Sequence, residues 1–320
     1  MKIGILRRGR NTSPLEGSPT RKARLIGWQR GVSVKGVATL KKNNNPENSV
    51  ASLNGHVEIN KRNYQSSFFP GYRNHVYIIF ILLFASCNTE NAPDCLQNSG
   101  NLIREEVALS EFTKITVFEN VALVLKQGGV QKVEIATGEY LRDEVSATVE
   151  GDRLLIKDTN DCNYFREYGL TTVYITSPNI TEIRSSTGQL IKSDGVLAYA
   201  NLTLLSESFN NPESETTDGE FDLEVDTQNL GVVVNGIAYF QLKGKTENLR
   251  LTIAAGDSRI EAGNLTAQSV SLNHRGANDM FVNPQRNISG TIRGTGDVIS
   301  SNRPDTVAVE ALYKGRLIFR

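Results

Sequence analysis

The chain has 320 residues, with 35 Lys and Arg against 35 Asp and Glu, 39% hydrophobic residues and three Cys. Its length allows one or two domains with cores of their own, its Val, Ile and Leu content excludes disorder throughout, and its polarity excludes a protein with many membrane spans. The zero net charge is a cancellation, because residues 1–75 carry +11 and the remainder carries −11. The chain therefore joins two unlike segments.

Residues 1–75 are basic and rich in Asn, Ser and Gly, and they have no sustained apolar periodicity. This pattern predicts either an unstructured leader or a segment upstream of the true translation start. A start near Tyr72 would need an alternative codon, because no Met lies between Met1 and Met280. The rival interpretation is a basic arm that binds nucleic acid or anionic lipid. Its charges are scattered and only Trp28 accompanies them, so we expect no nucleic-acid partner.

Residues 76–86 form an uncharged apolar run, preceded by Arg73 and followed by Cys87. The run is shorter than the roughly 20 residues that span a bilayer, but it fits the ~7–15 residues of a signal-peptide core. The alternative is a buried strand or helix that ends in Cys. The segment resembles a bacterial lipoprotein signal, with Leu83 to Cys87 as a loose lipobox. The resemblance implies cleavage behind Ser86 and a lipid on Cys87, which predicts an outer-membrane lipoprotein of the cell envelope.

Export would leave Cys95 and Cys162 in an oxidising compartment, where a disulfide is the default expectation. Such a bridge stabilises the folded state by about 4 kcal/mol by closing a long loop. It would also link the lipid-anchored linker of residues 87–104 covalently to the body. The alternative is two independent buried thiols. We expect no metal and no cofactor, because the exported part has one His, His274, and no closely spaced pair of ligands.

From Glu111 onward, apolar and polar residues alternate in short runs that Gly, Asp, Asn and Pro interrupt. Period-2 runs of this kind predict β-strands, and no stretch keeps a helical period. The body at residues 105–320 is therefore predicted to be all-β, beginning with an N-terminal block of strands up to Ser177.

After Ile180 the pattern becomes repetitive, with evenly spaced glycines at positions 236, 256, 276 and 296 and Asp close behind several of them. A repeat of about 20 residues cannot bury a face alone, so it predicts a parallel β-solenoid of about six or seven coils. Gly at a corner can adopt a positive φ, and Asp can bond its own backbone two residues on. The predicted corner residues are Gly236, Gly256, Asp257, Gly276, Asp279, Gly296 and Asp297.

The lipobox, the segment from Cys95 to Gly100, the Phe112-x-x-Ile115-x-Val117 strand and the Gly-Asp corners resemble one family. It is the Bacteroidetes family called putative auto-transporter adhesin, head GIN domain. The resemblance covers about residues 105–319 and implies an exported, often lipid-anchored, right-handed β-solenoid. The sequence departs from the family pattern at residues 206–217, where an acidic Asn/Glu/Ser stretch replaces a corner.

Catalytic groups are sparse. A Ser-His-Asp or Cys-His nucleophile needs a His, and the exported part offers only His274. Polysaccharide lyases and hydrolases on parallel β-helices use carboxylates and basic residues along one face, so such an enzyme is the alternative function. The residues that could form that face are Asp257, Asp279, Asp297, Arg259, Arg275 and Arg293. The architecture explains them more simply as corner and solvent-facing residues.

The aromatic cluster of Tyr164, Phe165 and Tyr168 is a candidate binding feature, because exposed rings stack on sugars or pack against a partner. The alternative is that the cluster caps the core beside Cys162. Together these patterns predict a non-catalytic envelope protein that acts in adhesion, scaffolding or recognition. Its expected partners are the membrane through the lipid anchor and either an envelope polysaccharide or another surface protein.

Overall fold

The computed structural model describes residues 97–160, 162, 169–210, 214 and 216–320, and the backbone of two strands before them. The chain divides into two compact units, Met1–Tyr72 and Arg73–Arg320. In the first unit, β1 (Thr20–Gln29) pairs antiparallel with β2 (Val32–Lys41), and Gln29 lies opposite Val32. The sequence did not predict these two strands. The assignment of residues 1–75 as a leader stays a prediction.

The described residues of the second unit are all-β, which confirms the predicted class, apart from one short 3-10 helix, η2 (Glu139–Glu144). Within the described residues, no helix is both long and apolar enough to cross a membrane. The strands of this unit are β3 (Leu102–Val107), β4 (Lys114–Val117), β5 (Val121–Gln127), β6 (Lys132–Gly138), β7 (Val145–Glu150), β8 (Arg153–Asp158), β9 (Thr171–Ser177), β10 (Glu182–Ser185), β11 (Leu190–Leu197), β12 (Asn201–Ser206), β13 (Glu220–Gly236), β14 (Tyr239–Gly256), β15 (Arg259–His274), β16 (Met280–Ile292), β17 (Val298–Ser300), β18 (Thr306–Ala311) and β19 (Leu317–Phe319).

The strand pairings form two rows that share the long strands β13 to β16. The first row runs β7-β8-β4-β10-β12 and continues through the second halves of β13 to β16 to β18. The second row runs β3-β6-β9-β5-β11 and continues through the first halves of the same strands to β17 and β19. Each long strand therefore contributes one segment to each row, and we call these two segments a repeat.

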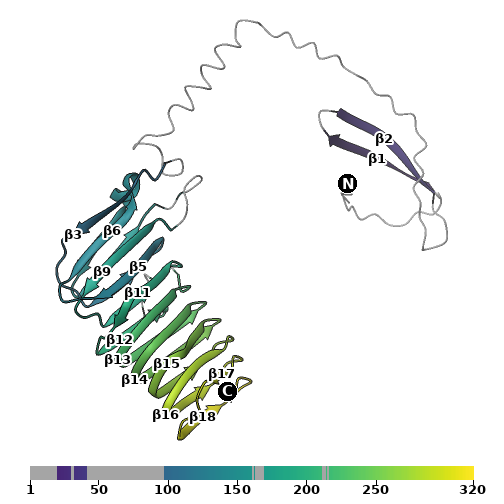
Figure 1. Ribbon diagram of the computed structural model, residues 1–320. Helices are drawn as coiled ribbons and strands as arrows, with labels where there is room; N and C mark the ends of the chain where they lie inside the picture. The colour runs from purple at the N-terminus through teal and green to yellow at the C-terminus, as the bar shows by residue number, and fades with distance from the viewer. Residues whose placement is uncertain are drawn as a thin grey trace. The chain divides into compact units, whose positions relative to one another are not determined.

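Neighbouring repeats pair in parallel, and Figure 1 shows the long strands β13 to β16 following one another in chain order. Phe221 lies beside Phe240, and Phe240 in turn lies beside Ile260. The spacing of the glycines in the sequence thus reappears in the register of the strands. Antiparallel pairs occur only in the N-terminal block, among the described strands of this unit: β3–β6, β6–β9 and β7–β8.

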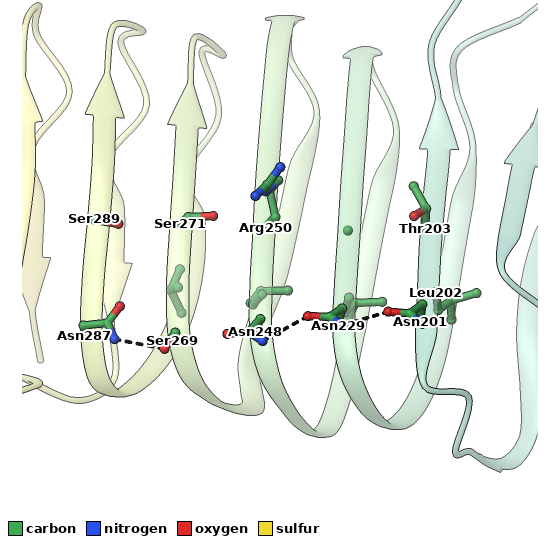
Figure 2. Close-up of a pocket in the computed structure, with 14 residues that line it drawn as sticks. Asn201, Leu202, Thr203, Asn229, Asn248, Arg250, Ser269, Ser271, Asn287 and Ser289 are labelled. Atoms are coloured by element: carbon green, nitrogen blue, oxygen red, sulfur yellow. Dashed lines mark hydrogen bonds between the residues drawn. The ribbon is translucent and has the colours of Figure 1, made fainter.

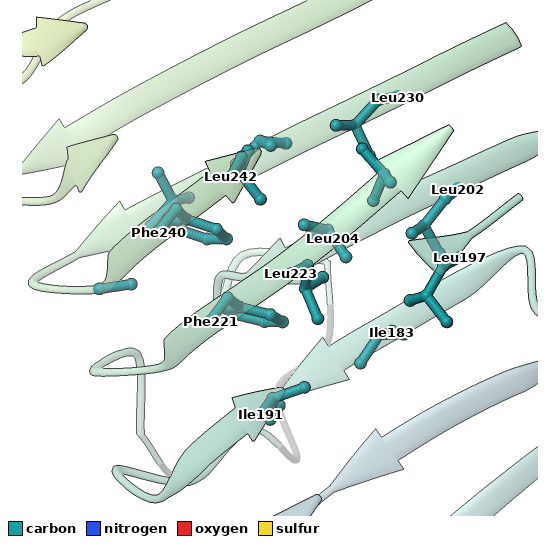
Figure 3. Packing of buried hydrophobic residues seen from close by; sticks show 14 of the residues in the cluster. Ile183, Ile191, Leu197, Leu202, Leu204, Phe221, Leu223, Leu230, Phe240 and Leu242 are labelled. Carbon is teal, nitrogen blue, oxygen red and sulfur yellow. The ribbon is translucent and has the colours of Figure 1, made fainter. Parts of the chain in front are cut away.

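One hydrophobic cluster lies between the two rows and takes alternate residues from each strand. Phe221 and Phe240 stack with their ring centroids 4.6 Å apart, while Leu204 and Leu230 of the first row lie in the same cluster (Figure 3). Full burial of such a side chain stabilises the folded state by about 1.5–3 kcal/mol. Because the repeats are in register, each inward position forms a column of buried side chains that passes through successive repeats.

The predicted corner glycines lie where successive repeats stack, but close backbone approach matters more there than a positive φ. Gly236 ends β13 and Gly256 ends β14, whereas Gly276 and Gly296 precede β16 and β17. A Cβ on Gly296 would come within 2.0 Å of the Asn278 carbonyl oxygen, although the φ of Gly296 is not positive. Two of the four combine a positive φ with such a contact: Gly256 has a φ of +90° and its Cβ would lie 2.2 Å from the Gly236 oxygen, and Gly236 has a φ of +157° and its Cβ would lie 2.4 Å from the Thr217 oxygen.

Two of the three predicted corner aspartates, Asp279 and Asp297, join one repeat to the next. Asp at a corner can bond its own backbone two residues on, but the hydrogen bonds of these two carboxylates run to the next repeat. The Asp279 Oδ1 atom accepts the backbone N–H of Asp297 at 2.9 Å, and the Asp297 Oδ1 atom accepts that of Arg316 at 2.8 Å. These bonds satisfy backbone donors that the strand ladder leaves free at the corners.

Replacing Gly296 by Ala is expected to lower the free energy of unfolding by about 1–3 kcal/mol, because the new methyl group overlaps a backbone oxygen of the preceding repeat. Gly129→Ala is the matched control, since a Cβ there meets nothing within 4 Å. The control is expected to change stability by less than about 1 kcal/mol. Urea unfolding of the whole chain measures both variants. Equal midpoints would show that backbone stacking does not require Gly296.

Candidate recognition surface

A groove of about 550 Å³ crosses the outer face of the first row, over strands β12 to β16 (Figure 2). The sequence analysis did not identify it, because its polar residues are far apart along the chain and meet only through the register. Its lining residues are Asn201, Leu202, Thr203, Asn229, Leu230, Gly231, Asn248, Leu249, Arg250, Ser269, Val270, Ser271, Asn287 and Ser289.

An asparagine ladder runs along one side of the groove. The Asn229 amide donates to the Asn201 Oδ1 atom at 2.7 Å, and the Asn248 amide donates to the Asn229 Oδ1 atom at 2.9 Å. The row continues where the Asn287 amide donates to the Ser269 hydroxyl oxygen at 2.9 Å (Figure 2). A side-chain amide has two N–H donors and two acceptor lone pairs, so each Asn keeps hydrogen-bonding capacity toward the groove.

The second column of the groove lies two residues further along each strand and contains Thr203, Gly231, Arg250, Ser271 and Ser289. Gly231 contributes no side chain, so it leaves a gap between Thr203 and Arg250. The Arg250 side chain is exposed, and no hydrogen bond or ion pair joins it to another residue in the part of the chain that the structure describes. The groove therefore presents one free guanidinium beside an opening.

The floor of the groove is fixed by the core. Leu202, Leu230, Leu249 and Val270 alternate with the polar positions and are each 1% exposed. Because these side chains pack between the two rows, the polar atoms above them are held at the spacing of the strands, about 4.7–4.9 Å. The site is therefore preorganised by the same columns that stabilise the fold.

The groove offers hydrogen bonds and almost no acid–base chemistry. Arg250 is the single ionisable residue among those that line it, whereas general acid–base catalysis needs groups that exchange protons near neutral pH. None of the six Asp and Arg residues considered for a catalytic face lines the groove. Asp279 and Asp297 bond the next repeat, and Arg259 pairs with Glu261 at 2.6 Å. The arrangement is suited to binding.

Several residues singled out in the sequence lie elsewhere. Cys162 is disulfide-bonded, but Cys95 lies outside the described residues, so their pairing stays a prediction. Cys87 and the aromatic cluster of Tyr164, Phe165 and Tyr168 also lie outside them. In the described ranges, no group of three or more His, Cys, Asp and Glu could hold a metal ion.

His274 is fully buried in the first row, and neither ring nitrogen makes a hydrogen bond of normal geometry. Burial lowers the pKa of His274 below its usual value of 6.5. The nearby backbone of Asn278 and Gly296 and the carboxylates of Asp279 and Asp297 oppose this effect without reversing it. The ring is therefore a neutral core side chain at pH 7, a burial that the sequence did not predict.

A buried ion pair is a further feature that the sequence did not reveal. The Arg184 guanidinium lies 2.7 Å from the Glu207 carboxylate, with side chains 8% and 1% exposed. The same guanidinium donates to the Glu207 carbonyl at 3.1 Å, and the Asn210 N–H donates to the carboxylate at 2.9 Å. Glu207 belongs to the stretch that departs from the family pattern. The first residues of the acidic stretch are thus bound to β10 through this ion pair. The buried carboxylate is tolerated because the guanidinium and the Asn210 N–H satisfy its hydrogen bonds.

In-register parallel strands with a polar groove on one outer face define an all-β protein of stacked strands. Residues 111–304 match the family model described as "Putative auto-transporter adhesin, head GIN domain", so the chain belongs to that family. This confirms the resemblance seen in the sequence. No curated protein matches the chain in sequence.

Solved structures share the fold. A "putative adhesin" from Bacteroides fragilis is 22% identical with a TM-score of 0.60, and the match covers 69% of this chain and 97% of that one. A "putative lipid binding protein" from Parabacteroides distasonis is 16% identical with a TM-score of 0.50, over 69% of this chain and 97% of that one. At these identities the likeness concerns the fold alone.

Stability is expected to fall as the pH drops below about 6.5, in part because the unfolded chain binds a proton at His274 more readily than the folded chain does. The contribution is fully present above the unfolded pKa of 6.5 and is lost as the pH falls toward the lowered folded pKa. His274→Leu and His274→Gln should both show a smaller loss between pH 7.5 and 5.5, measured by urea unfolding. An unchanged pH slope in both variants would contradict the assignment.

Proposed function

We propose that this chain is an exported, lipid-anchored protein of the cell envelope that recognises a surface partner through the groove on its first row, without catalysis. The observation that carries the proposal is the groove itself, where amides and hydroxyls are held in register and one residue is ionisable. Membership of a family described as adhesins supports a role at the envelope or cell surface. Adhesion needs a durable binding surface, and the side chains of this groove are held in place by the buried core residues beneath them.

The winding of the repeats belongs to the same proposal. Parallel neighbours joined by a crossover are right-handed in about 98% of cases, because a right-twisted strand packs back onto its sheet that way. The parallel pairing of β13 to β16, at a nearly constant separation along the chain, fits one full turn of the chain per repeat. We therefore assign the body as a right-handed parallel β-solenoid that follows an N-terminal strand block.

The anchor proposal depends on residues 76–87. An apolar run of signal-core length ends in Cys87, and the net charge changes sign across it. A lipid on Cys87 would tether the acidic body to a membrane, and the outer membrane is the location that we assign. One acyl chain alone holds a protein weakly, so the multiple chains of a lipoprotein anchor suit a permanent attachment.

The alternative of a polysaccharide lyase or hydrolase gains no support from the groove. Glycoside hydrolysis typically uses two carboxyl groups about 5–9.5 Å apart. The residues that line the groove include no Asp or Glu. A polymer that enters this groove would therefore meet hydrogen-bonding groups and one guanidinium, which hold a ligand without cleaving it.

The anchor is tested by metabolic labelling with palmitate in the bacterium that produces the protein. Cys87→Ala is expected to lose the label and to leave the membrane fraction, because the lipidated residue is gone. Cys95→Ala is the matched control and should keep both. Globomycin should stop processing of the unaltered chain. A Cys87→Ala chain that is still labelled and still sediments with membranes would refute the lipid anchor.

The recognition surface is tested by filling the groove. Gly231→Trp places an indole in the opening, and the fold should tolerate it because a Cβ there comes no closer than 3.5 Å to Thr203. Gln241→Trp places the same ring on the exposed outer face of the second row. Retention of the purified chain on envelope fragments should fall at least tenfold for Gly231→Trp and stay unchanged for the control. Equal retention would show that the groove is not the recognition surface.

A further inference from the structure

We propose that the ligand of the groove is a neutral polysaccharide, which lies across strands β12 to β16 along the asparagine ladder. This inference rests on the proposed function and names the ligand class of the same surface. It follows from the charge of the groove, from its unused hydrogen-bonding groups and from the spacing of its columns.

The charge of the groove excludes most other polymers. Nucleic acids and polyanions are held by several cations, each neutralising one charge of the ligand. Here Arg250 is the one cation that lines the groove, and the chain from residue 76 onward carries −11. A polyanion would therefore be repelled at long range and weakly held at contact. A polycation would meet Arg250 and find no carboxylate among the lining residues.

The burial of the apolar residues argues against a protein partner. Protein interfaces depend on exposed aromatic or aliphatic anchors near their centre. The apolar residues of this groove form its floor and are about 1% exposed, so no such anchor reaches the surface. What remains accessible is the amide, hydroxyl and guanidinium groups above that floor.

These polar groups suit a ligand covered with hydroxyls. The hydroxyls of Thr203, Ser271 and Ser289 form no hydrogen bond with other described residues. The ladder amides each keep a free N–H or a free lone pair. A sugar hydroxyl both donates and accepts, so it can pair with either kind of group. A surface of mixed donors and acceptors with a single charged group is therefore complementary to a neutral glycan.

The spacing of the columns favours a polymer. Successive strands lie about 4.7–4.9 Å apart, which is similar to the advance of one sugar in an extended polysaccharide. The register places one polar side chain per strand along this row, from Asn201 on β12 to Asn287 on β16. The gap at Gly231 can hold a sugar ring beside Arg250. The planar guanidinium of Arg250 can then donate hydrogen bonds to two neighbouring hydroxyls of the sugar. Arg250 would thus fix the position of the chain along the groove.

No aromatic side chain lines the groove, so affinity must come from many hydrogen bonds rather than from stacking. Each hydrogen bond contributes only about 0.5–1.5 kcal/mol net. A monosaccharide should therefore bind too weakly to detect at concentrations where the polymer binds well. Since the ligand is uncharged, binding should persist from about 0.05 to 0.5 M salt, whereas ionic binding is screened in that range.

The test uses the full chain and envelope fragments from the bacterium that produces it. Periodate cleaves vicinal diols and should abolish retention, while protease treatment of the fragments should leave it. Arg250→Gln should weaken retention at least tenfold at both salt concentrations. Lys243→Gln, an exposed lysine on the outer face of the second row, is the matched control and should have no effect.

A panel of immobilised neutral glucans, mannans and galactans, with polygalacturonate as the acidic comparison, identifies the sugar. At least one neutral polymer should retard the chain, and its monosaccharide should not compete.

Three results would overturn the inference: retention that survives periodate, retention that protease removes, or an Arg250→Gln chain that binds normally. If protease removes retention and Gly231→Trp also abolishes it, the ligand is a protein; the ligand class is then wrong while the proposed recognition role stands. If Gly231→Trp binds as well as the unaltered chain, the recognition role itself fails.

Discussion

The structure depends on the distance between hydrogen-bonded parallel strands, about 4.8 Å, which every repeat must keep at its strands and at its corners. Along the strands, side chains point away from the stacking direction and leave the spacing undisturbed. At the corners, backbone approaches backbone directly, as at Gly256 and Gly296, and a single methyl group does not fit. The recurring glycines are therefore steric requirements of stacking, and the aspartates between them satisfy the donors that stacking leaves unpaired.

The same register organises the two faces of each row differently. Inward positions become columns of apolar side chains such as Phe221 and Phe240. Outward positions of the first row become the asparagine ladder and the column of Arg250. The outer face of the second row instead carries charged pairs, including Lys245 with Asp226 at 3.1 Å. One stack thus presents a hydrogen-bonding surface with a single cation and a second surface of charged pairs, and the side chains at the outward positions account for the difference.

Local pattern in the sequence was sufficient for the all-β class and for the family resemblance. It was insufficient for the groove, because Asn229 and Asn248 become neighbours only when the exact register is known, and the glycine spacing alone does not define that register exactly. It also failed at Glu207, where an acidic residue in a polar stretch gives no sign of a buried ion pair with Arg184. Contacts between residues far apart in the sequence, rather than local propensity, determine both the groove and this ion pair.

The ladder has a consequence for how such proteins diversify. Since each repeat adds one amide or hydroxyl to the side of the groove, duplication or loss of a repeat changes the length of the groove by one strand spacing and keeps the same kind of hydrogen-bonding groups. Substitution at a single outward position, as at Arg250, changes the chemistry of the groove at that point and leaves the buried column beneath it unchanged. Length and selectivity can therefore evolve independently on this scaffold, the first by recombination between repeats and the second by point mutation.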